Sequence, residues 1–316
     1  MKIIYAFLAA SVVLVSCNQY EKTKSGFAYK IQSGGSKEKL KQGQFVKLNI
    51  EYKIGAKDSV LSSTYGHIPA YIVIDTARLG KYNFTEIIPL CSVGDKVQFV
   101  MSVDTLKKLG MIPDYNTVFT KKGSIKGRVE ILKAFTTEKD VNDDYMKEID
   151  AEKQREIKEV DEYAKKNSAK TEKTPNGVLV QIDNAGTGAK IDSTKQASVY
   201  YKGYLFNGKV FDTNIKDGVK GQAFNVVVGR HGAIPGWEEG LKYFAKGGKG
   251  KLFIPSLMAY GMQGNPPVIP PFSNLVFEIE IADVTDAPPP PAQNTMNQQA
   301  IQEQIKKMQQ AQSGKK

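Results

Sequence analysis

One stretch of the chain carries residues whose types and spacing could build an aromatic-lined cup. They are mostly aromatic or aliphatic, include a single carboxylate, and recur in four separated segments between Ala197 and Thr285. They are Tyr201, Phe211, Asp212, Phe224, Ile234, Trp237, Tyr260, Ile269 and Phe277. Segments that bring aromatic rings together around one acid predict an apolar binding site rather than a charged catalytic cleft.

Histidine and cysteine are too sparse for the usual nucleophilic or metal chemistry. The two histidines, His67 and His231, fall in different domains of the predicted architecture, so neither a catalytic triad nor a histidine-based metal site is expected. Cys91 lies in the apolar segment EIIPLCSVGD, and we expect it to be a small buried hydrophobe. The sequence therefore predicts no metal and no cofactor.

The four segments contain a set of motifs that occur together in one family. They read VYYKGYLFNGKVFDTN, AFNVVVGRHGAIPGWEEGL, GGKGKLFIPSLMAYG and NPPVIPPFSNLVFEIEIADV. In that order they carry YxGxLxxGxxFD, IxGWEEGL, IPxxxAYG and IPPxxxLxFxxE. This pattern closely resembles the FKBP-type peptidyl-prolyl cis-trans isomerases, and the resemblance runs from Thr174 to Thr285.

The resemblance implies a role for each residue of the site. Trp237 would be the floor beneath a proline ring, Tyr260 would donate its hydroxyl to a substrate carbonyl, and Asp212 would face the carbonyl that twists. Ile234 would form part of the wall and offer its backbone N–H to another carbonyl. The remaining wall and rim residues would be Tyr201, Phe211, Phe224, Ala233, Val268, Ile269 and Phe277.

Such a cup could catalyse rotation about a prolyl bond without any covalent step. The barrier, ~20 kcal/mol, is the loss of amide resonance when the C–N bond twists. A twisted amide is less dipolar than a planar one and loses less on leaving water. An apolar cup would therefore bind the transition state better than the ground state, which is what catalysis requires.

The elements that must position these residues read as strands with few helices. Strands are predicted over 178–182, 197–205, 224–228, 249–254 and 275–284, and one helix over 237–244. In the last strand Leu275, Phe277 and Ile279 alternate with Glu278 and Glu280, which is the period of a half-buried strand. The pattern predicts an α+β fold, and the resemblance implies an antiparallel sheet wrapped around a short helix.

An earlier part of the chain resembles a diverged copy of this domain. GQFVKLNIEYKIGAKDSVLSS is similar to ASVYYKGYLFNGKVFDTN, and SVGDKVQFVMS is similar to AKGGKGKLFIPS. Leu61 and Ser62 stand where Phe211 and Asp212 stand later, and Phe84 is the expected counterpart of Trp237. We therefore predict a degenerate FKBP-like domain without isomerase activity; an unrelated β domain is the alternative.

A long charged segment separates the two domains. Residues 137–167 contain no glycine or proline and predict a helix with a thin apolar stripe, which could be a solvated spacer or a seam for pairing into an oligomer. The expected boundaries are a signal peptide over 1–17, a tether over 18–25, the degenerate FKBP-like domain over 26–136, a helical linker over 137–173, the isomerase domain over 174–286 and a Pro/Gln-rich disordered tail over 287–316.

The N-terminal residues predict export and a lipid anchor. The run from Ile3 to Val15 carries no charge and is shorter than the roughly 20 residues that span a bilayer, as in a signal peptide. Leu14-Val15-Ser16-Cys17 resembles the bacterial lipobox, in which the cysteine is acylated. We expect Cys17 to carry the lipid. The protein would then lie in the cell envelope, on the outer membrane facing the periplasm.

Composition limits the remaining classes of function. A length of 316 residues predicts two compact domains, and the net charge of +11 is spread along the chain without a zinc-finger or RNA-recognition motif, so no nucleic acid is expected. We predict an isomerase that acts on Xaa-Pro-containing clients and assists the folding of exported proteins. The alternatives are a non-catalytic chaperone that holds proline-containing segments and a scaffold lipoprotein of an envelope machine.

Overall fold

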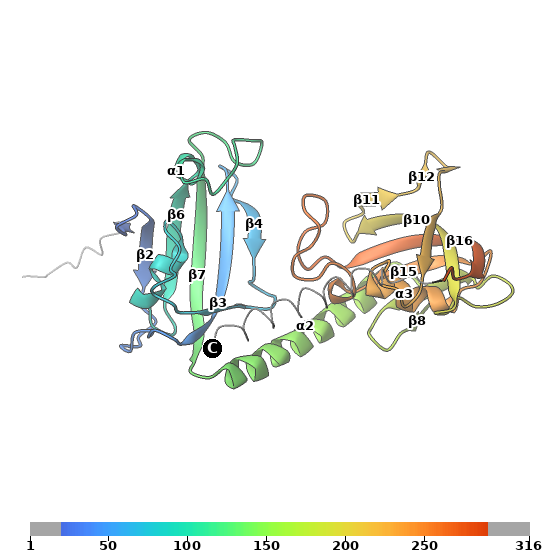
Figure 1. The fold of residues 1–316 in the computed structure, drawn as a ribbon, viewed down its shortest axis with the longest axis horizontal. Helices are drawn as coiled ribbons and strands as arrows, with labels where there is room; N and C mark the ends of the chain where they lie inside the picture. Colours follow the sequence, from blue (N-terminus) through green and yellow to red (C-terminus); the bar gives the residue numbers. More distant parts are fainter. Residues whose placement is uncertain (1–19, 290–316) are drawn as a thin grey trace, which may run out of the picture. The chain divides into compact units, whose positions relative to one another are not determined.

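The computed structural model describes residues 20–289, and the chain divides into two compact units. Unit 1 ends at Gln154 and unit 2 begins at Arg155, inside one long helix. Each unit combines an antiparallel sheet with short helices, so the predicted α+β class is confirmed (Figure 1). The predicted signal peptide, Cys17 and most of the tail lie outside the described residues. Within residues 20–289, no helix is long and apolar enough to cross a membrane.

Unit 1 is built on a seven-stranded sheet in the order β1-β2-β6-β7-β3-β4, with β5 also paired to β3. Its strands are β1 Glu21–Lys22, β2 Ala28–Gln32, β3 Phe45–Ile54, β4 Ser59–Ser63, β5 Ala70–Val73, β6 Lys96–Ser102 and β7 Ser124–Phe135. Its short helices are η1 Phe84–Glu86, η2 Ile88–Leu90 and α1 Val103–Lys108. Cys91 is buried in the core of this unit, as its apolar surroundings predict.

Unit 2 contains a second seven-stranded sheet, in the order β11-β10-β16-β15-β9-β8, with β14 also paired to β10. Its strands are β8 Thr171–Lys173, β9 Leu179–Asn184, β10 Lys195–Leu205, β11 Val210–Thr213, β14 Phe224–Val227, β15 Lys249–Ile254 and β16 Leu275–Asp286, and a separate hairpin pairs β12 Ile215–Lys216 with β13 Val219–Lys220. Its helices are α3 Pro235–Gly240, η3 Leu241–Tyr243 and η4 Ser256–Met258. The helix begins at Pro235, before the predicted start, because proline favours the first helical position.

The two sheets have the same topology, strand for strand. Reading along the chain, β2 to β5 of unit 1 correspond to β9, β10, β11 and β14 of unit 2, and β6 and β7 correspond to β15 and β16. Even the irregularity in the central pairing recurs, after Lys47 in β3 and after Ser198 in β10. A short helix precedes β6 and β15 in both units. The predicted resemblance between the two halves of the sequence thus corresponds to one shared strand order.

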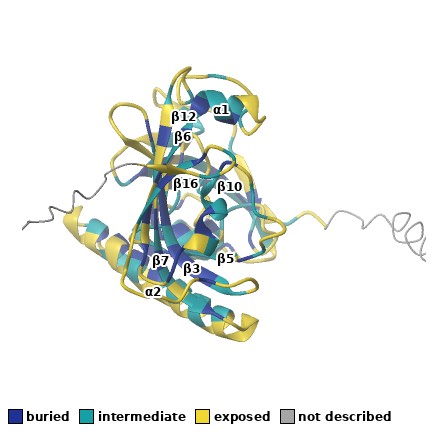
Figure 2. Ribbon diagram, turned by 90° about the vertical axis from the view of Figure 1, so that its left-hand side faces the viewer, coloured by how far each residue is buried: buried dark blue, intermediate teal, exposed yellow. Residues whose placement is uncertain are grey.

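The long helix α2, Glu138–Lys166, packs against each unit through a different part of its length. In unit 2, Val160 and Ala164 are buried on the outer face of the sheet, against Phe253 and Val276. In Figure 2 the exposed residues of α2 alternate with partly buried ones, as expected for a helix that covers a sheet. Part of the apolar stripe predicted as a spacer or pairing seam is therefore used within the chain.

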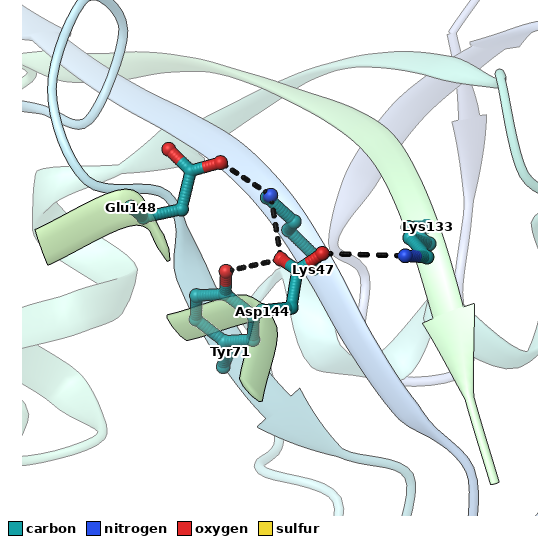
Figure 3. Close-up of polar contacts among 5 residues, drawn as sticks. All are labelled: Lys47, Tyr71, Lys133, Asp144 and Glu148. Atoms are coloured by element: carbon teal, nitrogen blue, oxygen red, sulfur yellow. Dashed lines mark hydrogen bonds and ion pairs between the residues drawn. The ribbon is translucent and has the colours of Figure 1, made fainter. Parts of the chain in front are cut away.

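In unit 1, α2 is held by a cluster of charged side chains on β3 and its neighbours (Figure 3). The ammonium group of Lys47 contacts the carboxylates of Asp144 and Glu148 at 2.7 and 2.6 Å. Asp144 also accepts hydrogen bonds from the Tyr71 hydroxyl, at 2.7 Å, and from Lys133, at 3.2 Å. Buried charges are tolerated when they are paired and hydrogen-bonded in this way.

The carboxyl group of Asp144 makes the stability of unit 1 depend on acid pH. Burial acts to raise its pKa, but hydrogen bonds from Lys47, Tyr71 and Lys133 outweigh burial and lower the pKa from 3.8 to about 2. Because the folded pKa lies below the unfolded one, the stabilisation is complete above pH ~4 and is lost as pH falls towards 2, by roughly 2 kcal/mol.

We expect Asp144→Asn to remove this loss, so that its unfolding free energy falls less between pH 4 and 2 than that of the wild type. Urea unfolding followed by circular dichroism at several pH values measures the difference. Asp143→Asn, at an exposed position of the same helix, is the matched control. Identical acid profiles for wild type and Asp144→Asn would contradict the assignment.

Candidate active site

A concave pocket of about 230 Å³ in unit 2 collects most of the predicted site residues. Nine of them line it, together with Gly232, which is not among the predicted residues. The lining residues are Tyr201, Phe211, Asp212, Phe224, Gly232, Ala233, Ile234, Trp237, Tyr260 and Phe277. The other two do not line it: Ile269 is buried in the core of unit 2, and Val268 is exposed on the loop before β16.

Trp237 forms the base of this pocket and three aromatic rings stand around it. The ring centroids of Tyr201, Phe224 and Phe277 lie 5.2, 5.8 and 5.2 Å from that of Trp237, with interplanar angles of 82–86°. Edge-to-face packing of this kind fixes the rings relative to one another. The indole is 3% exposed, and its N–H has no hydrogen-bond partner among the described residues.

The sheet of unit 2 sets the positions of these rings. Tyr201 lies on β10 and Phe277 on β16, where Phe277 pairs with Gly203 of β10. A Cβ atom at Gly203 would come within 2.7 Å of both Phe211 and Phe277. Because that contact is too short for real atoms, only glycine at this position leaves room for both rings. The glycine of the YxGxLxxG motif is thus explained by packing.

The polar groups of the pocket lie at its rim. The Tyr201 hydroxyl donates to Asp212 at 2.6 Å, and burial together with this bond raises the pKa of Tyr201. Burial and the nearby negative charge of Asp212 also raise the pKa of Tyr260. Both tyrosines are therefore neutral hydroxyl donors at physiological pH. The hydroxyl of Tyr260 has no hydrogen-bond partner in the described part of the chain, so it can donate to a ligand.

The start of helix α3 presents a backbone donor to the pocket. Ile234 is the N-cap residue, with extended backbone angles, and its carbonyl accepts the N–H of Trp237 at 2.9 Å. Its own N–H donates to no group of residues 20–289. An apolar pocket with an N–H, a tyrosine hydroxyl and one carboxylate at its rim can bind a peptide segment through its carbonyls and bury one apolar side chain. No group of three metal-ligating side chains gathers in the described residues.

The corresponding register positions in unit 1 carry different residues. The register puts Ser62 opposite Tyr52 in unit 1, where Asp212 stands opposite Gly203 in unit 2. In unit 2 the glycine of the central strand pair is Gly203 of β10, whereas in unit 1 it is Gly127 of the partner strand β7. Gly127 packs so closely on the buried ring of Phe99 that a Cβ atom would lie 1.9 Å from it. Phe99 also contacts Phe84 and Tyr52, with centroid distances of 6.5 and 5.6 Å.

A larger depression of about 950 Å³ lies on the other face of the sheet of unit 2. The β12–β13 hairpin covers it, and Lys220 of the hairpin pairs with Glu280 at 2.8 Å and lies over the ring of Tyr200. Its floor carries further lysine–glutamate pairs, such as Lys251 with Glu278. Since these lysine and glutamate charges neutralise one another, whereas the smaller pocket joins aromatic rings with a few polar groups, the smaller pocket is the better candidate site.

Comparisons with known proteins point to the same part of the chain. Residues 188–282 match the family described as FKBP-type peptidyl-prolyl cis-trans isomerase. Over 128 residues the chain is 42% identical to the FKBP-type peptidyl-prolyl cis-trans isomerase FkpA of Escherichia coli (strain K12), a match that covers 40% of this chain and 44% of that protein. The chain therefore spans less than half the length of that relative.

A second relative and a solved structure are also similar to this chain. Over 189 residues the chain is 34% identical to the FKBP-type peptidyl-prolyl cis-trans isomerase FkpA of Buchnera aphidicola subsp. Baizongia pistaciae (strain Bp), which covers 56% of this chain and 72% of that protein. The crystal structure of FkpA from Escherichia coli aligns with 48% of this chain and 69% of its own, at 35% sequence identity and a TM-score of 0.37.

Proposed function

Because the chain belongs to the family of FKBP-type peptidyl-prolyl cis-trans isomerases, we propose that unit 2 catalyses cis-trans isomerisation of Xaa-Pro bonds. The observation that carries the proposal is the set of three aromatic rings standing edge-on around Trp237. A pocket of about 230 Å³ is large enough for a proline ring and too small for a folded element. Its substrates are accessible or unfolded polypeptide segments that contain proline.

The catalytic step follows from the groups at the rim of the pocket. The proline ring rests on Trp237, and the N–H of Ile234 and the hydroxyl of Tyr260 each hold a substrate carbonyl. The amide preceding proline then twists in an apolar environment, which favours the less dipolar twisted state. Asp212, held by Tyr201, faces the carbonyl that rotates out of the plane. No bond to the substrate forms or breaks.

Unit 1 is proposed to be an FKBP-like domain without turnover. Its strand order is that of unit 2, but Gly127 stands at the register position of the pocket residue Phe277, with Phe99 packed over it, and Ser62 stands at that of Asp212. One observation favours an additional holding function for this unit. Leu109, Met111 and Val118, on the segment between α1 and β7, are 50, 48 and 45% exposed. Exposed apolar side chains on one segment suit transient binding of unfolded clients.

The protein is proposed to act in the cell envelope, anchored by a lipid on Cys17 to the outer membrane and facing the periplasm. The uncharged N-terminal run and the lipobox-like Leu14-Val15-Ser16-Cys17 support this localisation. Two or more acyl chains give stable anchoring, whereas one does not. Pairing of two chains through α2 is also proposed, since part of its apolar stripe, including Tyr145 and Ile149, is only half-buried.

The role proposed for the Asp212 carboxylate can be tested by substitution. We expect Asp212→Asn to lower kcat/KM for a Leu-Pro peptide about tenfold, which is a loss of about 1.4 kcal/mol of transition-state stabilisation. A protease-coupled or NMR exchange assay on the full chain, purified in detergent, measures it. Ser62→Ala changes the matching position of unit 1 and should leave the rate unchanged. Equal rates for Asp212→Asn and wild type would remove the carboxylate from the mechanism.

A further inference from the structure

A carboxylate from the long helix is buried beside the segment that carries Tyr260. Glu156 of α2 is 1% exposed and belongs to unit 2. Its carboxylate accepts a hydrogen bond from the hydroxyl of Ser256 and another, at 2.9 Å, from the backbone N–H of Leu257. The short helix η4 begins at Ser256, so Glu156 satisfies donors at its start that have no partner within the helix.

Ser256 in turn fixes the backbone on both sides of Tyr260. Its carbonyl accepts the N–H of Ala259 and the N–H of Gly261, each at 2.8 Å. These are the residues immediately before and after Tyr260 in the chain. Because Ser256 is completely buried, its position is determined by its hydrogen-bond partners and not by solvent. Two steps of hydrogen bonding therefore connect Glu156 with the backbone of a rim residue of the pocket.

A second carboxylate, one turn further along α2, is connected to Ser256 through Asn274. Glu159 accepts a hydrogen bond from the side-chain amide of Asn274 at 2.9 Å. The amide oxygen of Asn274 accepts the backbone N–H of Ser256, also at 2.9 Å. Residues three apart lie on one face of a helix. The face of α2 that carries Glu156 and Glu159 thus holds Ser256 from two sides.

We infer that Glu156 is a positioning residue for the isomerase site, which acts by holding the segment 256–261 so that the hydroxyl of Tyr260 stays at the pocket rim. This inference rests on the function proposed for unit 2. It makes the C-terminal half of α2 a part of the active-site architecture and not only a connector. A displacement of a rim donor by about 1 Å can reduce a rate 10- to 100-fold, because alignment at the reacting amide is lost.

The test compares three substitutions in the full chain, purified in detergent. Glu156→Ala removes both acceptors and should lower kcat/KM for a Leu-Pro peptide on the order of tenfold. Glu156→Gln retains an acceptor for Leu257 and can donate to the Ser256 hydroxyl, so we expect it to stay within about threefold of wild type. Glu162→Ala, at an exposed position of the same helix, is the control and should have no effect.

A double-mutant cycle separates positioning from general destabilisation. If Glu156 acts through Tyr260, Glu156→Ala should lower the rate less than twofold further when Tyr260 is already phenylalanine, because coupled residues are not additive. A full tenfold loss in the Tyr260→Phe background would overturn the inference. So would a loss of the same size in Glu156→Gln.

Hydrogen exchange gives a readout that does not depend on turnover. In Glu156→Ala, the amides of Ala259 and Gly261 should exchange at least about tenfold faster than in Glu162→Ala, while amides of β10 remain protected. Unchanged protection of Ala259 and Gly261 would also overturn the inference. A wild type that shows no isomerase activity would refute the proposed function of unit 2, whereas the exchange data would still decide whether Glu156 positions this segment.

Discussion

Replacement of Trp237 with alanine is expected to eliminate measurable isomerase activity and to destabilise unit 2 by about 3–5 kcal/mol. Trp237 is 3% exposed and touches Tyr201, Phe224 and Phe277, so its removal leaves a large cavity at the base of the pocket. The proline ring would lose its apolar support. A loss of about 3 kcal/mol of transition-state binding corresponds to a fall of at least about 100-fold in kcat/KM.

Two further substitutions test whether the effect of Trp237→Ala is specific to the pocket of unit 2. Trp237→Leu keeps an apolar side chain and should retain the fold, so its activity reports on the pocket apart from stability. Phe84→Ala changes the predicted counterpart of Trp237 in unit 1, where Phe84 stacks on Phe99, and should destabilise unit 1 without lowering the isomerase rate. If Phe84→Ala lowered the isomerase rate and Trp237→Ala did not, the active site would lie in unit 1 and the proposal for unit 2 would be wrong.

Cys17→Ala is expected to abolish fatty-acid incorporation completely and to move the protein out of the membrane fraction or leave it unprocessed. The physical reason is that acyl chains contribute about 0.8 kcal/mol per buried methylene, while residues 20–289 contain no helix that could cross a membrane. Metabolic labelling with a fatty acid, followed by fractionation and intact mass, measures both effects. Mutation of Cys91, which is buried in unit 1, is the control and should leave the label in place.

A wild-type protein that takes up no fatty acid and retains residues upstream of Cys17 would refute the proposed anchor. It would also remove the main argument for an envelope location. It would leave the proposal for the pocket untouched, since no residue of the pocket lies near Cys17 in sequence.

The strands and the pocket residues could be predicted because each prediction depends on residues that are close together in the sequence. Alternation along β16 identifies Leu275, Phe277 and Ile279 as core residues, and the structure buries all three. The pocket residues come from motifs with fixed spacing, and the motifs were enough to name nine of the residues that line it. Ile269 lies in the same motifs, but it packs into the core of unit 2, and the motif spacing alone does not distinguish a core residue from a lining residue.

Contacts between residues that are far apart in the sequence could not be predicted in this way. Nothing in the sequence around Glu156 distinguishes it from the exposed acids of α2, and its burial appears only when the helix docks on the sheet of unit 2. Val276 lies on the same face of β16 as Glu278 and Glu280, yet it is fully buried because it packs with Val160 and Ala164 of α2. In unit 1, Tyr52 of β3 stands at the register position of Gly203, and Gly127 of β7 stands at that of Phe277. That change is visible only in the register of the two strands.

The rate at which the full-length wild-type chain catalyses exchange of a Leu-Pro peptide tests the central claim most directly. If the apolar pocket around Trp237 is the active site, the exchange rate should exceed the uncatalysed rate by an amount that rises linearly with enzyme concentration. The uncatalysed reaction takes tens to hundreds of seconds, so catalysis is easily resolved. The emission of Trp237, the single tryptophan, verifies in the same sample that unit 2 is folded. An exchange rate equal to the uncatalysed rate in a folded sample would contradict the account.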